Sequence, residues 1–103
     1  MKPIIPPESR CWLEIDLAAL RQNYRIIESM CSDGCMPIAV VKANAYGHGD
    51  LEIARLCVGA GADAFAVATA AEGVRLRRGG VRGTILVLGY SGPELAPLLA
   101  RYR

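Results

Sequence analysis

Four short apolar runs alternate along the chain with stretches whose apolar residues have helical spacing. The runs are Trp12–Ile15, Ile38–Val41, Ala64–Ala68 and Thr84–Leu88. The interiors of the last three runs are almost entirely apolar, which is typical of strands covered on both faces in a parallel sheet. The strict alternation that would indicate a one-sided antiparallel sheet is absent. The pattern therefore predicts four parallel strands, each followed by a helix.

A helix start signal follows each run. The residues predicted to cap the four helices are Asp16, Asp50, Thr69 with Glu72, and Ser91 with Glu94, all of types that accept hydrogen bonds from the first turn. Pro93 is compatible with such a first turn. The first helix has an apolar stripe of Leu17, Leu20, Tyr24, Ile27 and Met30, and the second directs Ile53, Ala54 and Cys57 inward. Glycines predict the ends of the second and third helices, at Gly59 or Gly61 and at Gly79–Gly80.

The predicted fold class is α/β, with the first four βα units of a (βα)8 TIM-type barrel. A complete barrel of this kind needs about 250 residues, so we interpret the chain of 103 residues as a fragment. We assign residues 1–10 to an N-terminal tail and residues 11–103 to a partial barrel domain. An open four-stranded flavodoxin-like sheet is the alternative. No glycine-rich phosphate loop follows the first run, so a dinucleotide site gains no support.

Composition narrows the possible functions. Hydrophobic residues make up 52% of the chain, and the formal charge is +2. Only Arg75, Arg77 and Arg78 cluster, and we interpret them as the solvated end of a helix, so we expect no nucleic-acid partner. The chain contains neither a signal-peptide pattern nor an apolar stretch of membrane-spanning length. We therefore expect a protein of the cytoplasm without membrane contact.

The cysteines are not arranged as a metal site. Cys11, Cys31, Cys35 and Cys57 contain no C-x-x-C pair, and His48 is the only histidine. Isolated cysteines in apolar surroundings are usually reduced core or surface residues. We predict no metal ion and no disulfide.

The residues that could carry chemistry begin at Lys42. This lysine follows the apolar run at 38–41, at the end of a strand where α/β folds place their ligands. We expect partial desolvation there, which favours the neutral amine that forms a Schiff base with an aldehyde. Small residues after it would let a flat ring and a phosphate approach the backbone. Composition alone, however, favours a lysine that extends into solvent.

The full string decides between these interpretations. Ala39-Val40-Val41-Lys42-Ala43-Asn44-Ala45-Tyr46-Gly47-His48-Gly49 closely resembles the cofactor-lysine signature of the alanine racemase family. The likeness extends to Trp12-Leu13-Glu14-Ile15-Asp16-Leu17-Ala18-Ala19-Leu20, to Ala66-Val67-Ala68-Thr69 and to Ile85-Leu86-Val87-Leu88-Gly89. It therefore covers nearly all of the chain after its first ten residues.

The resemblance implies a pyridoxal 5'-phosphate enzyme and gives roles to three residues. Lys42 would bind the cofactor as a Schiff base and then act as the base on one face of the substrate α-carbon. Tyr46 would help to hold the phosphate, and Leu88 would pack on the cofactor. No catalytic role is carried over to His48, which we expect to be a loop residue satisfied by backbone groups. In the family, the second base is a tyrosine from a C-terminal β-domain of the partner subunit, so a homodimer is expected for the complete enzyme.

The predicted function is racemisation of alanine, which supplies D-alanine for cell-wall peptidoglycan. A serine racemase of the vancomycin-resistance type has a similar catalytic half and remains an alternative, as does a cofactor-binding remnant without catalysis. A barrel-type pyridoxal-phosphate decarboxylase shares the architecture. However, the continuation Tyr46-Gly47-His48-Gly49 argues against it.

The same resemblance predicts that these 103 residues by themselves lack useful racemase activity. Inversion at a carbon needs a proton-transfer group on each face, and in the family the second group lies in the C-terminal domain. Measuring the conversion of L-alanine or L-serine by the purified chain tests this. Turnover comparable to that of a complete enzyme would contradict it.

Overall fold

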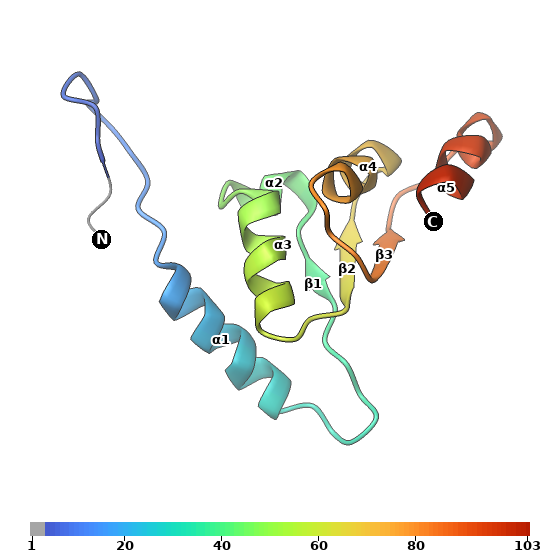
Figure 1. The fold of residues 1–103 in the computed structure, drawn as a ribbon, viewed down its shortest axis with the longest axis horizontal. Coiled ribbons are helices and arrows are strands. Elements are labelled where there is room, and N and C mark those ends of the chain that lie inside the picture. Colours follow the sequence, from blue (N-terminus) through green and yellow to red (C-terminus); the bar gives the residue numbers. More distant parts are fainter. Residues whose placement is uncertain (1–3) are drawn as a thin grey trace.

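Three short parallel strands form the centre of the molecule. The computed structural model describes residues 4–103, and its strands β1 (Ala39–Val40), β2 (Ala64–Val67) and β3 (Thr84–Val87) lie in the spatial order β1-β2-β3. The helices are α1 (Leu17–Ser29), α2 (Lys42–Tyr46), α3 (Asp50–Gly59), α4 (Ala70–Arg78) and α5 (Ala96–Tyr102), with a 3-10 turn η1 (Pro93–Leu95) before α5 (Figure 1). The predicted parallel α/β arrangement is confirmed.

The hydrophobic core lies on one face of the sheet. Phe65 and Val67 of β2 pack there with Leu76 of α4 and with Ile53 and Cys57 of α3. The register aligns Val40, Ala66 and Leu86 on the opposite face. On that face Val40 is 43% exposed and Leu86 is 46% exposed. The prediction that both faces are covered is therefore correct for β2 and wrong for the two outer strands, which have a strand neighbour on one side only.

The predicted strand at 12–15 does not form. Residues 11–16 have no regular secondary structure, and Trp12 and Leu13 are 51% and 82% exposed. The indole nitrogen of Trp12 donates locally to the Glu14 carboxylate at 3.0 Å. An extended segment becomes a strand only where a neighbouring backbone pairs with it, and the described sheet contains β1, β2 and β3 alone. The structure therefore has three strands where the sequence pattern predicted four.

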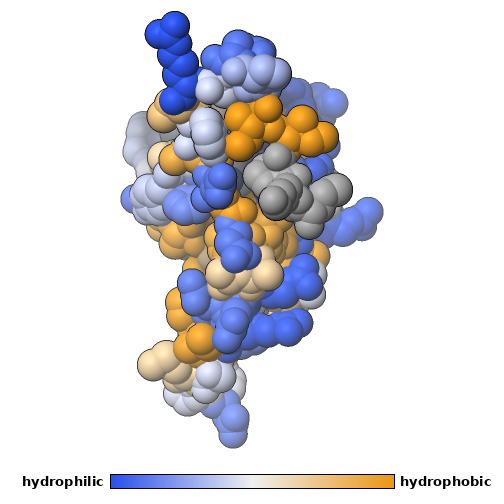
Figure 2. Space-filling view, turned by 90° about the vertical axis from the view of Figure 1, so that its left-hand side faces the viewer, coloured by the Kyte–Doolittle hydropathy of each residue, from blue (hydrophilic) through white to orange (hydrophobic). Residues whose placement is uncertain are grey.

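Helix α1 buries only part of its predicted stripe. Tyr24 is buried in the core and Leu20 packs against it, whereas Leu17, Ile27 and Met30 are 43%, 58% and 79% exposed. Seen from the side on which α1 lies, the surface carries hydrophobic side chains among hydrophilic ones (Figure 2). The apolar stripe exceeds what one neighbour can cover, because α1 packs mainly against α3.

Two of the four predicted caps are confirmed. Asp16 accepts from the Ala19 amide at 3.0 Å, and Thr69 accepts from the Glu72 amide at 3.2 Å. The prediction for Asp50 is wrong, because Gly49 occupies the N-cap of α3 with φ of 96°. Only a glycine adopts such a conformation at little cost.

The predicted cap at Ser91 is also wrong. The N-cap of the final helical segment is Gly92, one residue later, and it makes no side-chain cap. Pro93 occupies the first turn, as predicted, and its fixed φ begins a 3-10 turn. The chain therefore enters α5 through η1 and not through a capping box.

The arginine cluster at the end of α4 makes contacts with other parts of the protein. Arg77 donates to the carbonyls of Val81 and Gly83, at 3.0 and 2.8 Å, and to the Tyr102 carbonyl at 3.0 Å. The guanidinium of Arg78 lies 5.9 Å from the ring centre of Tyr102. The interpretation of this cluster as a solvated helix end is therefore wrong for Arg77, which ties the end of α4 to the C-terminal end of α5.

The four cysteines are free thiols. Cys11 and Cys35 are exposed, whereas Cys57 is buried in the core. Burial raises the pKa of the Cys57 thiol, because desolvation disfavours the thiolate. Cys57 therefore acts as a small apolar core residue. Within residues 4–103, no helix is long and apolar enough to cross a membrane.

Leu76→Ala should lower the free energy of unfolding by about 2–5 kcal/mol, because Leu76 is fully buried and its truncation leaves a cavity. Leu86→Ala is the matched control. The same truncation at this half-exposed position should cost much less. Urea unfolding followed by circular dichroism measures both. Equal losses would contradict the one-sided core.

Candidate active site

The candidate site lies at the C-terminal ends of the strands. Lys42 comes directly after Val41, whose amide still bonds to the Ala66 carbonyl at 2.9 Å. On the other side of β2, the ladder continues past β3: the Leu88 amide bonds to the Val67 carbonyl at 2.8 Å. Lys42 and Leu88 thus lie at one sheet edge with one strand between them, about 10 Å apart by strand spacing.

The exposure of the three predicted site residues differs. Lys42 is partly buried. Tyr46 is 65% exposed and Leu88 is 53% exposed. Leu88 follows β3, and Ala68 follows β2. The two segments are joined where the Gly89 amide donates to the Ala68 carbonyl at 3.0 Å, so two apolar residues lie at the strand ends. Gly89 allows the two strand ends to approach closely, because a Cβ there would lie 2.4 Å from the Ala68 carbonyl oxygen.

The turn that follows Lys42 is left-handed. Ala43, Asn44, Ala45 and Tyr46 all have positive φ, between 50° and 56°. Each L-residue in this conformation costs roughly 1–2 kcal/mol, and such strain is commonly found at functional sites. Sequence reasoning treated the small residues here as room for a ligand and missed the turn. The one signal that could have indicated it was Asn44, because asparagine tolerates positive φ better than most other residues with a Cβ.

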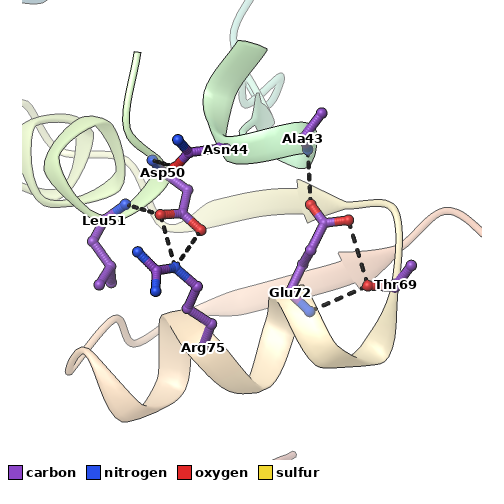
Figure 3. Close-up of polar contacts among 7 residues, drawn as sticks. All are labelled: Ala43, Asn44, Asp50, Leu51, Thr69, Glu72 and Arg75. Atoms are coloured by element: carbon purple, nitrogen blue, oxygen red, sulfur yellow. Dashed lines mark hydrogen bonds and ion pairs between the residues drawn. The ribbon is translucent and has the colours of Figure 1, made fainter. Parts of the chain in front are cut away.

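Local hydrogen bonds close the left-handed turn. The Asn44 carbonyl accepts from the Gly47 and Gly49 amides at 3.1 and 3.0 Å, and the Asn44 side chain accepts from the Asp50 amide at 3.0 Å (Figure 3). His48 Nδ1 lies 2.9 Å from the Ala45 carbonyl oxygen. The prediction that His48 is satisfied by backbone groups is confirmed.

A hollow among the described residues lies elsewhere. It has a volume of about 650 Å³ and lies between α1 and α3, lined by Arg21, Arg25, Glu52 and Arg55 among others. Lys42 does not line it. We place the candidate site at the strand ends, because the predicted nucleophilic amine lies there. The hollow is lined by Leu17, Ala18 and Leu56 as well as by charged side chains, but by no lysine. The residues described by the structure contain no cluster of three potential metal ligands.

Comparison with known proteins identifies the family. A family model described as "Alanine racemase, N-terminal domain" matches residues 15–103. The chain belongs to the alanine racemase family. The matched part of this racemase-family chain contains Lys42, the left-handed turn and all three strands.

Individual relatives agree with this assignment. Alanine racemase 1 of Bacillus subtilis is 44% identical over 91 residues, which cover 88% of this chain and 23% of that protein. The crystal structure of alanine racemase from Bacillus anthracis with bound L-Ala-P superposes with a TM-score of 0.87 at 38% identity, over 95% of this chain and 25% of that one. A histidine racemase from Leuconostoc mesenteroides gives a TM-score of 0.74 at 37% identity, over 84% and 23% of the two chains. The chain thus spans about a quarter of the length of the family members it matches.

Substitution of Gly47 tests the geometry of the turn. Gly47 has φ of 93° and open space where a Cβ would lie, so Gly47→Ala should lower the free energy of unfolding by about 1–2 kcal/mol through backbone strain alone. Gly59→Ala is the control, because Gly59 ends α3 with an ordinary φ, and there the change should be neutral or stabilising. Chemical denaturation of both variants provides the measurement. An unaffected Gly47→Ala variant would contradict the left-handed turn.

Proposed function

We propose that this protein is a pyridoxal-phosphate-dependent amino-acid racemase that interconverts L- and D-alanine, with Lys42 as the residue that holds the cofactor. The observation that carries the proposal is a partly buried lysine at the end of β1, within the region matched by the racemase family model.

The residues at this edge fit the cofactor. Lys42 supplies the amine that condenses with its aldehyde. Ala68 and Leu88 supply an apolar surface for a flat ring, and the Tyr46 hydroxyl is a polar group for the phosphate. Tyr46 extends from the turn with 65% of its surface exposed, and Leu88 has 53% exposed, so both side chains are accessible to a ligand.

When bound, pyridoxal phosphate supplies a conjugated ring that accepts electrons and so makes the α-proton of an amino acid acidic. The task left to Lys42 is to remove or return that proton on one face of the α-carbon. Lys42 is partly buried at the strand ends, which restricts the access of water to its side chain. The left-handed turn fixes the backbone that carries it.

The second proton-transfer group must act on the opposite face. We propose that it is a tyrosine in a C-terminal β-domain of a partner subunit, as the family resemblance implies, and that the protein works as a homodimer in the cytoplasm. Alanine or another amino acid is the substrate and no nucleic acid is involved. Inversion then requires the two faces to be served by two subunits.

A different amino-acid substrate is a second candidate. The histidine racemase from Leuconostoc mesenteroides and the alanine racemase from Clostridium difficile are both 37% identical to this chain, with TM-scores of 0.74 and 0.79. Similarity over this region therefore does not separate the two substrates. The class of reaction is common to both.

Covalent labelling tests the role of Lys42. Lysine occurs only at positions 2 and 42, so Lys2→Arg leaves Lys42 as the single lysine. In this background, pyridoxal phosphate followed by borohydride should modify Lys42, and Lys42→Ala should remove the modification together with the visible absorbance band. Mass spectrometry of tryptic peptides measures the site. Circular dichroism confirms that the double variant is folded.

The matched wild-type chain controls for general amine reactivity. Because the Lys2 amine and the N-terminal amine also react with aldehydes, Lys42 must be labelled faster than either. Equal rates at all three amines, or an unchanged absorbance band in the Lys42→Ala variant, would sink the proposal.

A further inference from the structure

Helix α4 reaches across to both ends of the left-handed turn. Glu72 and Arg75 are three residues apart on α4 and therefore lie on one face of that helix. Glu72 points to the start of the turn at Ala43, and Arg75 points to Asp50 just beyond its end (Figure 3). One face of α4 thus contacts both Ala43 and Asp50, and the strained backbone lies between these two residues.

The contact at the start of the turn involves the peptide bond of Lys42 itself. Glu72 Oε2 accepts from the Ala43 amide at 2.8 Å. This amide and the Lys42 carbonyl belong to one planar peptide unit. Holding that unit fixes the backbone torsion of Lys42, and with it the direction in which the Lys42 side chain leaves the strand end. A carboxylate acceptor makes this a charge-assisted bond, stronger than one between neutral groups.

The contact at the far end is an ion pair between a buried carboxylate and a largely exposed arginine. The Asp50 side chain is 6% exposed, and its oxygens accept from Arg75 Nε at 2.9 and 3.1 Å. Asp50 also accepts from the Leu51 amide at 2.8 Å. Its own amide donates to the Asn44 side chain at 3.0 Å. Asn44, inside the turn, is thereby connected to α4 through Asp50.

The predicted capping box of Thr69 and Glu72 begins α4 and also connects this helix to the left-handed turn. Thr69 accepts from the Glu72 amide, as a cap does, but the Glu72 carboxylate does not close the box on the Thr69 backbone amide. One carboxylate oxygen lies 3.4 Å from the Thr69 hydroxyl, and the other extends across to Ala43. The side chain that a capping box would use locally joins two elements that are 29 residues apart in sequence.

We propose that Glu72 is a positioning residue for Lys42, and that the Asp50–Arg75 pair is the second anchor of the same turn. This inference rests on the proposed cofactor role of Lys42. Without the bond from Glu72, the strained residues after Lys42 can relax toward ordinary backbone conformations, and the Lys42 amine loses its fixed direction. With the bond in place, the lysine is held in one orientation before any ligand binds.

Three single variants in the Lys2→Arg background separate this role from helix stability. Glu72→Ala removes the acceptor. Glu72→Gln keeps it, because the amide oxygen can accept from Ala43 while the amide nitrogen faces the Thr69 hydroxyl. Thr69→Ala is the control. It removes the cap and weakens α4, and it removes the 3.4 Å contact of the Thr69 hydroxyl with Glu72 Oε1, yet it leaves Oε2 as the acceptor for the Ala43 amide.

Two measurements are made on each variant of the 103-residue chain. Amide exchange followed by NMR reports whether the Ala43 amide is protected. Labelling with pyridoxal phosphate and borohydride gives the rate at Lys42 relative to the N-terminal amine. Glu72→Ala should speed exchange at Ala43 and slow labelling at Lys42, each by about tenfold, as expected for loss of a hydrogen bond to a charged group. Glu72→Gln should restore most of both, because its neutral amide oxygen still accepts but makes a weaker bond. Thr69→Ala should lower the melting temperature without changing either.

Each result bears on a distinct claim. Unchanged labelling in Glu72→Ala overturns the positioning role, and unchanged exchange at Ala43 overturns the hydrogen bond by which Glu72 holds the turn. Equal losses in Thr69→Ala would assign the effect to helix stability and also overturn the inference. If Lys42 of the parent chain reacts no faster than the N-terminal amine, the proposed cofactor role fails, while exchange at Ala43 still decides whether Glu72 holds the turn.

Discussion

Four consecutive L-residues with positive φ are the constraint around which the candidate site is built. Ala43 to Tyr46 adopt a conformation that costs free energy at every position. Such a turn persists only where neighbouring groups hold it. The holding groups come from α3 and α4, through the Asp50 amide and the Glu72 carboxylate. The local geometry at Lys42 therefore depends on helix packing that forms over a long stretch of sequence.

The sheet explains why those helices are in reach. Because β1, β2 and β3 are parallel and lie in chain order, right-handed crossovers place α3 and α4 on the same side of the sheet, where Phe65 and Leu76 are fully buried. This packing places the first turn of α4 beside the loop that leaves β1. The carboxyl ends of parallel strands share one edge, so Lys42 and Leu88 face one region although they are far apart in sequence. The free face of the sheet, with Val40 and Leu86 half exposed, is the side on which a larger barrel of the family would close.

Among the described residues, buried charge occurs only beside the candidate site. Asp50 is the one charged residue buried among those that the structure describes, and a buried carboxylate needs a partner. Arg75 supplies it while remaining largely exposed itself. Arg77, two residues further on, bonds to four backbone carbonyls around the far end of α4. Arg75 thus pairs with a buried carboxylate, whereas Arg77 binds backbone carbonyls. Composition alone could not distinguish these two roles.

The sequence by itself determined the parallel α/β pattern, the strands around Val40, Phe65 and Ile85, the caps at Asp16 and Thr69, and the lysine after the first of those strands. These features follow from local periodicity and from side chains that bond within a few residues. Tertiary structure alone decided the rest. The run at 12–15 has strand composition but finds no backbone to pair with, and Gly49 takes the cap expected of Asp50. Glu72 and Arg75 bond to Ala43 and Asp50 because the fold brings together residues that are more than twenty positions apart, a distance over which no local pattern carries information.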